Sequence, residues 1–160
     1  MLGQLKRIQL KLLFIFGLIA AITISGCGGD SSSDPVDAYL GTWKSKCYQY
    51  SAGVYTQHIR IVTKQNATQF LSTDPNTNAY SDANCTVLTG TGTLVQKGGV
   101  FSLGAKATFL GQSVDTFTFA GSGLTASGYI TTVGNELYMA VTVTATPPTS
   151  WGASSPETKL

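Results

Sequence analysis

Short glycine-containing turns between alternating segments constrain the fold of this chain more than any other feature. They are Ala52-Gly53, Gly98-Gly99, Gly111-Gln112, Gly121-Ser122-Gly123 and Gly134-Asn135. Glycine adopts positive φ without steric cost, which suits tight hairpins. Parallel strands need crossovers of a dozen or more residues, and these turns leave no room for them. The sequence therefore predicts an antiparallel meander.

The segments between the turns alternate apolar and polar residues, which predicts a sheet with one face on a core and one in water. The alternation places Phe101, Leu103, Ala105, Ala107 and Phe109 on one face of their strand, and Leu137, Met139, Val141 and Val143 on one face of theirs. We expect Phe101, Leu103, Phe109, Leu137, Met139 and Val141 to line an interior cavity. The predicted strands are 42–50, 54–64, 67–73, 85–96, 100–110, 113–120, 124–133 and 136–146, with a long loop from Asp74 to Asn84.

About eight strands of this kind either close into a barrel or form two packed sheets. Closure removes exposed strand edges, so we expect an all-β, up-and-down antiparallel barrel over residues 35–146, with a β-sandwich as the alternative. A short helical turn is predicted at its start, with Asp34 as the cap and Pro35 at the first position. Residues 147–160 are predicted to be an irregular tail in which Trp151 covers a barrel end.

The first 26 residues have the composition of a signal-peptide helix. Lys6, Arg7 and Lys11 precede an uncharged apolar run of 13 residues, 12–24. A membrane-spanning helix needs about 20 apolar residues, so this run has the length of a signal peptide rather than of a span. A plain secretory signal and a permanent membrane helix are the alternatives, in that order.

The end of the apolar run, Ile24-Ser25-Gly26-Cys27, resembles the lipobox of bacterial lipoproteins. The resemblance implies cleavage before Cys27, which becomes the lipid-carrying first residue of the mature protein. Residues 27–34 would then be the lipidated cysteine and a flexible tether. Gly28 is not the aspartate that favours inner-membrane retention in Gram-negative bacteria, so the resemblance implies an outer-membrane location if the source has that membrane.

The three cysteines agree with export. If Cys27 carries lipid, Cys47 and Cys85 remain, and an exported pair is most simply a disulfide. Two thiolates binding a metal are the alternative, but His58 is the only histidine and further ligands are lacking. We therefore expect a disulfide, no metal site and no cofactor.

The charge of the mature chain argues against nucleic-acid binding. Three of the ten Lys and Arg residues lie in residues 1–26, which leaves seven basic residues against eight acidic ones, a net charge of −1. Proteins that bind nucleic acids carry an excess of basic residues to contact the phosphates. We expect the membrane, through the lipid on Cys27, and either a small ligand or an envelope protein as partners.

The segment Gly41-Thr42-Trp43, at the start of the first predicted strand and after a short helical turn, resembles the Gly-x-Trp motif of lipocalins and related calycin barrels. The resemblance implies a lipocalin-like barrel. In those families the tryptophan packs at the closed end, so the resemblance assigns that role to Trp43.

Catalytic chemistry is not expected. His58 alternates with Thr56 and Arg60, opposite Ile59 and Ile61, which predicts that the imidazole lies on the solvent face of its strand. Ser127-Gly128 and Gly121-Ser122-Gly123 lack the strand–turn–helix setting of a nucleophile elbow. We therefore expect a binding protein and not an enzyme.

Two binding functions and a structural role follow as hypotheses. A barrel with an open interior would hold a small apolar ligand. A filled barrel would bind another protein; Ser127-Gly128-Tyr129 resembles the inhibitory loop of small lipoprotein barrels that inhibit lysozyme, a hydrolase of the cell wall. A structural duty in the bacterial envelope is the third.

Overall fold

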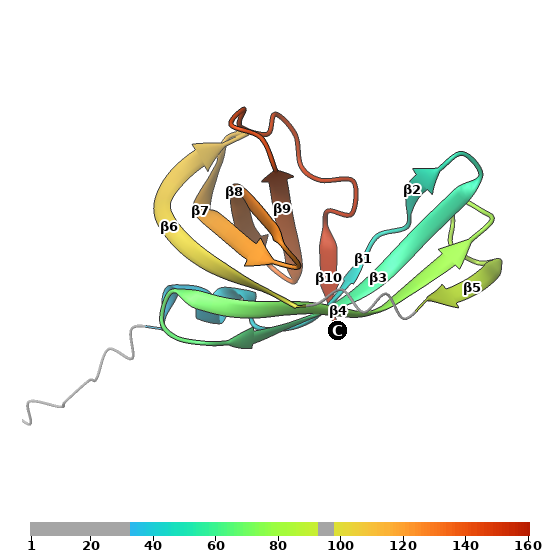
Figure 1. Ribbon diagram of the computed structural model, residues 1–160, viewed down its shortest axis with the longest axis horizontal. Coiled ribbons are helices and arrows are strands. Elements are labelled where there is room, and N and C mark those ends of the chain that lie inside the picture. The colour runs from blue at the N-terminus through green and yellow to red at the C-terminus, as the bar shows by residue number, and fades with distance from the viewer. Residues whose placement is uncertain (1–32, 93–97) are drawn as a thin grey trace, which may run out of the picture. The chain divides into compact units, whose positions relative to one another are not determined.

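Eight antiparallel strands close into an up-and-down barrel of the lipocalin-like kind, which confirms the predicted fold class (Figure 1). Each strand of the ring pairs with the next ring strand in the sequence, and the last pairs with the first. The computed structural model describes residues 33–92 and 98–160, so the predicted signal peptide and the lipid-carrying Cys27 lie outside the described residues. The ring consists of β1 (Gly41–Ser45), β3 (Val54–Lys64), β4 (Gln69–Tyr80), β6 (Gly99–Phe109), β7 (Gln112–Gly121), β8 (Leu124–Val133), β9 (Glu136–Thr142) and β10 (Glu157–Lys159).

A short 3₁₀ helix, η1 (Pro35–Tyr39), covers one end of the barrel, where the helical turn was predicted. Val36 and Tyr39 of η1 are buried in the inner core together with Trp43 of β1. The indole Nε1 of Trp43 donates a hydrogen bond of 2.8 Å to the carbonyl of Tyr39. The rest of this core comes from the ring strands: Val62, Phe70, Phe101, Phe117, Ile130, Leu137 and Met139. This end of the barrel is therefore solidly packed, and Trp43 belongs to it.

Strands β3 and β4 are longer than the barrel and continue into a second, smaller piece of sheet (Figure 1). There β2 (Tyr48–Ser51) pairs with the first half of β3, and β5 (Leu88–Gly92) pairs with the second half of β4. We call β2, β5 and these two half-strands the wing. The predicted disulfide Cys47–Cys85 joins the residue before β2 to the loop before β5, with its Cα atoms 5.7 Å apart. The bond therefore fastens the two outer strands of the wing to each other.

The predicted long loop from Asp74 to Asn84 is wrong, because β4 runs on to Tyr80. The register between β3 and β4 shifts by one residue between Ile59 and Ile61. Proline cannot donate to a strand ladder and is tolerated inside a sheet at a bulge. Pro75 lies at this shift, so the strand continues through the proline instead of ending before it. Only residues 81–87 form the loop, and the predicted strand 85–96 begins at Leu88; its last residues, 93–96, lie outside the described part of the chain.

A second register shift, in β6, explains why the predicted single apolar face of this strand is wrong. The pairing with β7 shifts by one residue between Leu103 and Lys106. An extra residue moves every later side chain to the other face of a strand, and glycine within a strand is a common place for it. Gly104 lies at this position. Phe109 consequently packs on the outer face of the barrel, in a small cluster with Val114, Tyr129, Ala140 and Trp151.

The predicted irregular tail is also corrected. Residues 143–156 have no helix or strand, but Glu157–Lys159 form β10, which pairs with both β1 and β9 and so closes the ring. Trp151 does not cover a barrel end; its ring lies 4.8 Å from that of Phe109 and 5.5 Å from that of Tyr138, on the outer face. The three residues of β10, between Pro156 and Leu160, are too few for an alternation of apolar and polar residues to be recognised in the sequence.

Loss of the disulfide is expected to destabilise the domain. Cys47 and Cys85 are 38 residues apart, and closing a loop of that length stabilises a protein by about 4 kcal/mol in the chain-entropy model. We predict that the Cys47→Ser/Cys85→Ser double variant unfolds at a clearly lower urea concentration than the wild type. Added reductant should lower the midpoint of the wild type but leave that of the variant unchanged. Equal midpoints for wild type and variant would contradict this role.

Candidate functional site

An open cavity of about 390 Å³ lies between the barrel and the wing, away from the end packed by η1. Its lining comes from two kinds of strand. A polar wall on β2, β3 and β4 faces an apolar wall on β6, β7, β8 and β9. The polar wall contains Tyr48, Thr56, His58, Arg60, Ser72 and Asp74, and the apolar wall contains Phe101, Phe119, Leu124, Ala126, Met139 and Val141.

The polar wall is organised around an ion pair between Arg60 of β3 and Glu157 of β10. Arg60 Nε donates to Glu157 Oε2 at 2.9 Å and to Oε1 at 3.2 Å, and the Glu157 side chain is only 1 % exposed. Arg60 Nη1 donates to Ser72 Oγ at 3.0 Å. His58 Nε2 lies 3.3 Å from both Glu157 Oε1 and Arg60 Nη2. We call Arg60, Glu157, His58, Ser72 and Asp74 the polar cluster.

Asp74, the fifth member of the polar cluster, is held less tightly than Glu157. Its Oδ1 lies 3.6 Å from Arg60 Nη1, which is beyond hydrogen-bond distance. Asp74 Oδ1 and Thr56 Oγ1 are buried, and no described residue forms a hydrogen bond with either atom. Both residues line the cavity. Since buried polar atoms in proteins almost always have partners, these two are the atoms of the wall whose hydrogen-bonding capacity is unused.

The protonation state of the cluster follows from its geometry. Burial alone would raise the pKa of Glu157, but the charge of Arg60 and the hydrogen bonds from His58 and Arg60 outweigh burial and lower it. Burial likewise opposes the charge on Arg60, and the carboxylates of Glu157 and Asp74 outweigh this and raise the pKa of Arg60. Arg60 and Glu157 are therefore both charged in the folded protein at neutral pH.

The apolar wall is shaped by aromatic rings and small residues. Phe101 packs against Phe119, with ring centroids 4.9 Å apart. Gly99 lies under the Phe119 ring, and a Cβ atom at this glycine would overlap that ring. Ala126 is buried on the neighbouring part of the lining. Small residues at these positions leave room that larger ones would fill.

Of the six residues predicted to line the cavity, Phe101, Met139 and Val141 do so. Leu137 is in the inner core, and Leu103 packs against that core. Phe109 is on the outer face for the reason given above. The alternation of β9 was therefore read correctly, whereas that of β6 holds only up to its bulge.

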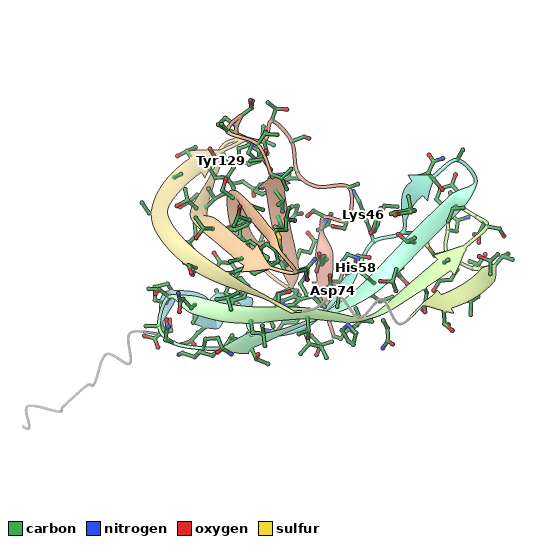
Figure 2. All side chains as sticks on the ribbon, viewed as in Figure 1. Lys46, His58, Asp74 and Tyr129 are labelled. Carbon is green, nitrogen blue, oxygen red and sulfur yellow. A yellow bond between two sulfur atoms is a disulfide. The ribbon has the colours of Figure 1, made fainter. Side chains whose placement is uncertain are left out.

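The prediction that His58 lies on the solvent face is wrong. The residue is 6 % exposed and points into the barrel, near β10 and Asp74 (Figure 2). The alternation correctly placed Thr56, His58 and Arg60 on one face of the strand, but this face is turned towards the cavity and not towards solvent. Sequence reasoning also missed Glu157, which lies 97 residues beyond Arg60 in a segment without strand periodicity. A lone buried arginine needs an acidic partner, but the sequence does not tell which acid supplies it.

The segment Ser127-Gly128-Tyr129 does not form a loop, so its likeness to an inhibitory loop is wrong. These residues lie within β8, paired with β7 and β9. Tyr129 stacks on Phe109 with ring centroids 4.6 Å apart, on the outer face (Figure 2). A Cβ atom at Gly128 would overlap the carbonyl oxygen of Ala140, so the glycine is required for close packing of these strands.

The side chains of the polar cluster engage one another. The imidazole of His58 faces Glu157 and Arg60, while the Ser45 hydroxyl accepts a hydrogen bond of 2.9 Å from the His58 backbone N–H. Across residues 33–92 and 98–160, no three His, Cys, Asp or Glu side chains are grouped to hold a metal ion. In the same residues no helix is long and apolar enough to cross a membrane.

Comparison with known proteins adds no relative. No protein-family model matches the chain, and neither a curated protein nor a solved structure does.

The ion pair makes a prediction about acid stability. Because the pKa of Glu157 is lowered on folding, the unfolded chain takes up the proton first, near the ordinary glutamate pKa of about 4.3. The stabilisation is thus fully present above that pH and is lost as the pH falls through the lower folded-state pKa. Glu157→Gln should cost about 3 kcal/mol at neutral pH, because Arg60 stays buried without its charged partner. Urea unfolding at several pH values should show that the difference in the free energy of unfolding between the wild type and Glu157→Gln shrinks towards low pH.

Glu136→Gln is the matched control, since it removes one carboxylate from the outer face of β9, where Glu136 Oε2 accepts a hydrogen bond from Tyr138. We expect its stability to stay within about 0.5 kcal/mol of the wild type. A pH profile for Glu157→Gln that runs parallel to the wild type would show that Glu157 does not carry the ion pair.

Proposed function

We propose that this protein is a lipid-anchored protein of the bacterial envelope whose barrel binds a small ligand with an apolar part and a polar end. The observation that carries the proposal is the cavity with one apolar and one polar wall. Its volume of about 390 Å³ falls within the range of roughly 300–1,000 Å³ that is usual for small-molecule sites. The purely apolar ligand expected from the sequence is thereby replaced by an amphipathic one.

A binding role, rather than catalysis, is supported by the engagement of the charged side chains with one another. Arg60 and Glu157 stabilise each other's charge, and His58 Nε2 lies 3.3 Å from each of them. A catalytic acid or base is usually placed to reach a substrate and has its pKa shifted towards the operating pH. Here the pKa of Glu157 is shifted away from neutrality.

The envelope location is supported by three features of the chain. The charged and apolar regions of residues 1–26 are in the order of a signal peptide, and Ile24-Ser25-Gly26-Cys27 resembles a lipobox. The disulfide Cys47–Cys85 fits an oxidising compartment. A lipid on Cys27, followed by the short tether to Asp34, would hold the barrel close to a membrane surface.

Ligand binding is tested with the neutral dye N-phenyl-1-naphthylamine, whose fluorescence rises in an apolar site. The protein is residues 28–160, exported behind a cleavable signal; this segment contains every ring strand, the inner core and the disulfide. We predict saturable binding of the dye by the wild type. Val141→Trp places a large ring in the cavity lining, where it would occupy space that the dye needs. This variant should bind the dye at least about tenfold more weakly, a loss of 1.4 kcal/mol.

Val133→Trp is the control for this test. Val133 is 51 % exposed, close to the 49 % of Val141, but it does not line the cavity. Its dye binding should equal that of the wild type. If both variants bind the dye as the wild type does, the dye site lies elsewhere and the cavity is not the binding site.

Membrane attachment is tested in the full chain, expressed in a bacterium that processes lipoproteins. We predict that the wild type incorporates labelled palmitate and sediments with membranes. Cys27→Ala should incorporate no label, because the thiol that carries the lipid is gone. Labelling that persists in Cys27→Ala would refute the assignment of the lipid to this residue.

A further inference from the structure

We propose that the polar end of the ligand is a protonated amine and that Asp74 is the residue that binds it. This inference rests on the proposed binding of a small ligand in the barrel cavity and goes beyond it by naming the head group. The ligand class is thus a small amphiphilic amine, with an aliphatic or aromatic tail against the apolar wall and an ammonium group at the polar wall.

The charges that face the cavity favour a cation. The polar cluster contains two carboxylates, Asp74 and Glu157, and one guanidinium, Arg60. Arg60 Nε donates to both carboxylate oxygens of Glu157, so the charge of this pair is balanced. Asp74 is left with a contact of 3.6 Å to the same guanidinium. Asp74 therefore adds a carboxylate to a pair that is already balanced, and a carboxylate brought by a ligand would be repelled by it.

The position of Asp74 points in the same direction. The residue lies at the bulge of β4, where the strand register shifts opposite Arg60. Bulges often re-aim a side chain at a functional site. The Asp74 side chain lines the cavity, and its Oδ1 accepts no hydrogen bond from any described residue. An ionised carboxylate accepts hydrogen bonds only, so its natural partner is a donor group, and a charged donor forms the strongest bond.

The remaining lining suits the rest of such a molecule. Tyr48 and Tyr50 lie on the wing side of the cavity, and Phe101 and Phe119 on the opposite side. Aromatic faces attract ammonium groups as well as apolar chains. Thr56, whose buried hydroxyl also has no partner among the described residues, offers a second hydrogen bond on the same wall. A carboxylate ligand would gain none of the interaction that Asp74 offers.

The test compares three ligands with the same eight-carbon tail: octylamine, octanol and octanoate. Each displaces the naphthylamine dye from residues 28–160 at pH 7.5 and constant ionic strength, where the amine is protonated and the acid is ionised. We predict that octylamine displaces the dye at a concentration at least about tenfold lower than octanol does, and that octanoate is the weakest, since a charge-assisted hydrogen bond contributes more than a neutral one. Equal potency of octylamine and octanol, or stronger binding of octanoate, would overturn the proposal.

Asp74→Asn locates the amine site. The variant keeps the side-chain shape and removes the charge, so octylamine should lose about tenfold in affinity while octanol is unaffected. Unchanged octanol binding reports that the cavity is intact. Glu136→Gln, on the outer face, should bind all three ligands as the wild type does. A loss that is equal for all three ligands in Asp74→Asn would overturn the role of Asp74.

The outcomes also separate this proposal from the one on which it rests. If the dye binds in the cavity but octylamine shows no preference over octanol, the head-group assignment fails and the ligand cavity stands. If neither the dye nor any of the three ligands binds, both proposals fail. The comparison among ligands uses the wild type alone, so it decides the matter even if Asp74→Asn does not fold.

Discussion

The buried ion pair between Arg60 and Glu157 is the interaction on which closure of this barrel depends. Glu157 lies on β10, a strand of three residues inserted between β1 and β9. So short a strand gains little from its own ladder of hydrogen bonds, and an unpaired glutamate at 1 % exposure would be strongly destabilising. The charge of Arg60 stabilises the buried carboxylate of Glu157. The pair also fixes which residue of β10 faces inward. The last residues of the chain are thereby tied to its third strand.

Those parts of the fold that arise from local interactions could be predicted from the sequence. Hairpin turns such as Gly111-Gln112 and Gly134-Asn135 join neighbouring strands, and their residues specify the turn without reference to the rest of the chain. A meander follows from a series of such turns. The pairing of Cys47 with Cys85 followed from elimination, because the lipobox resemblance assigned the third cysteine. The antiparallel order of the strands before β10 therefore needed no long-range information.

What the sequence could not supply was the face of each strand and the partner of each buried charge. Period two separates a strand into two sets of residues but does not say which set is inside. In β3 the set with Ile59 and Ile61 is the more apolar, yet the barrel buries His58 and Arg60 instead. The bulges in β4 and β6 reverse the alternation halfway along a strand. Gly104 and Pro75 are the local signs of these bulges, but each residue type is also common in turns and loops.

The polar wall of the cavity comes from the inward-facing residues of β3 and β4. Strands β3 and β4 serve the barrel at one end and the wing at the other, and the register shift lies where the two meet. Side chains on both sides of this shift, Ser72 and Thr77 among them, line the cavity opposite the core residues Phe101 and Met139. The apolar wall opposite keeps its alternation in the residues that line the cavity, because the bulge of β6 lies beyond Phe101. The amphipathic character of the cavity therefore follows from the polar residues that β3 and β4 turn inward where they leave the barrel for the wing.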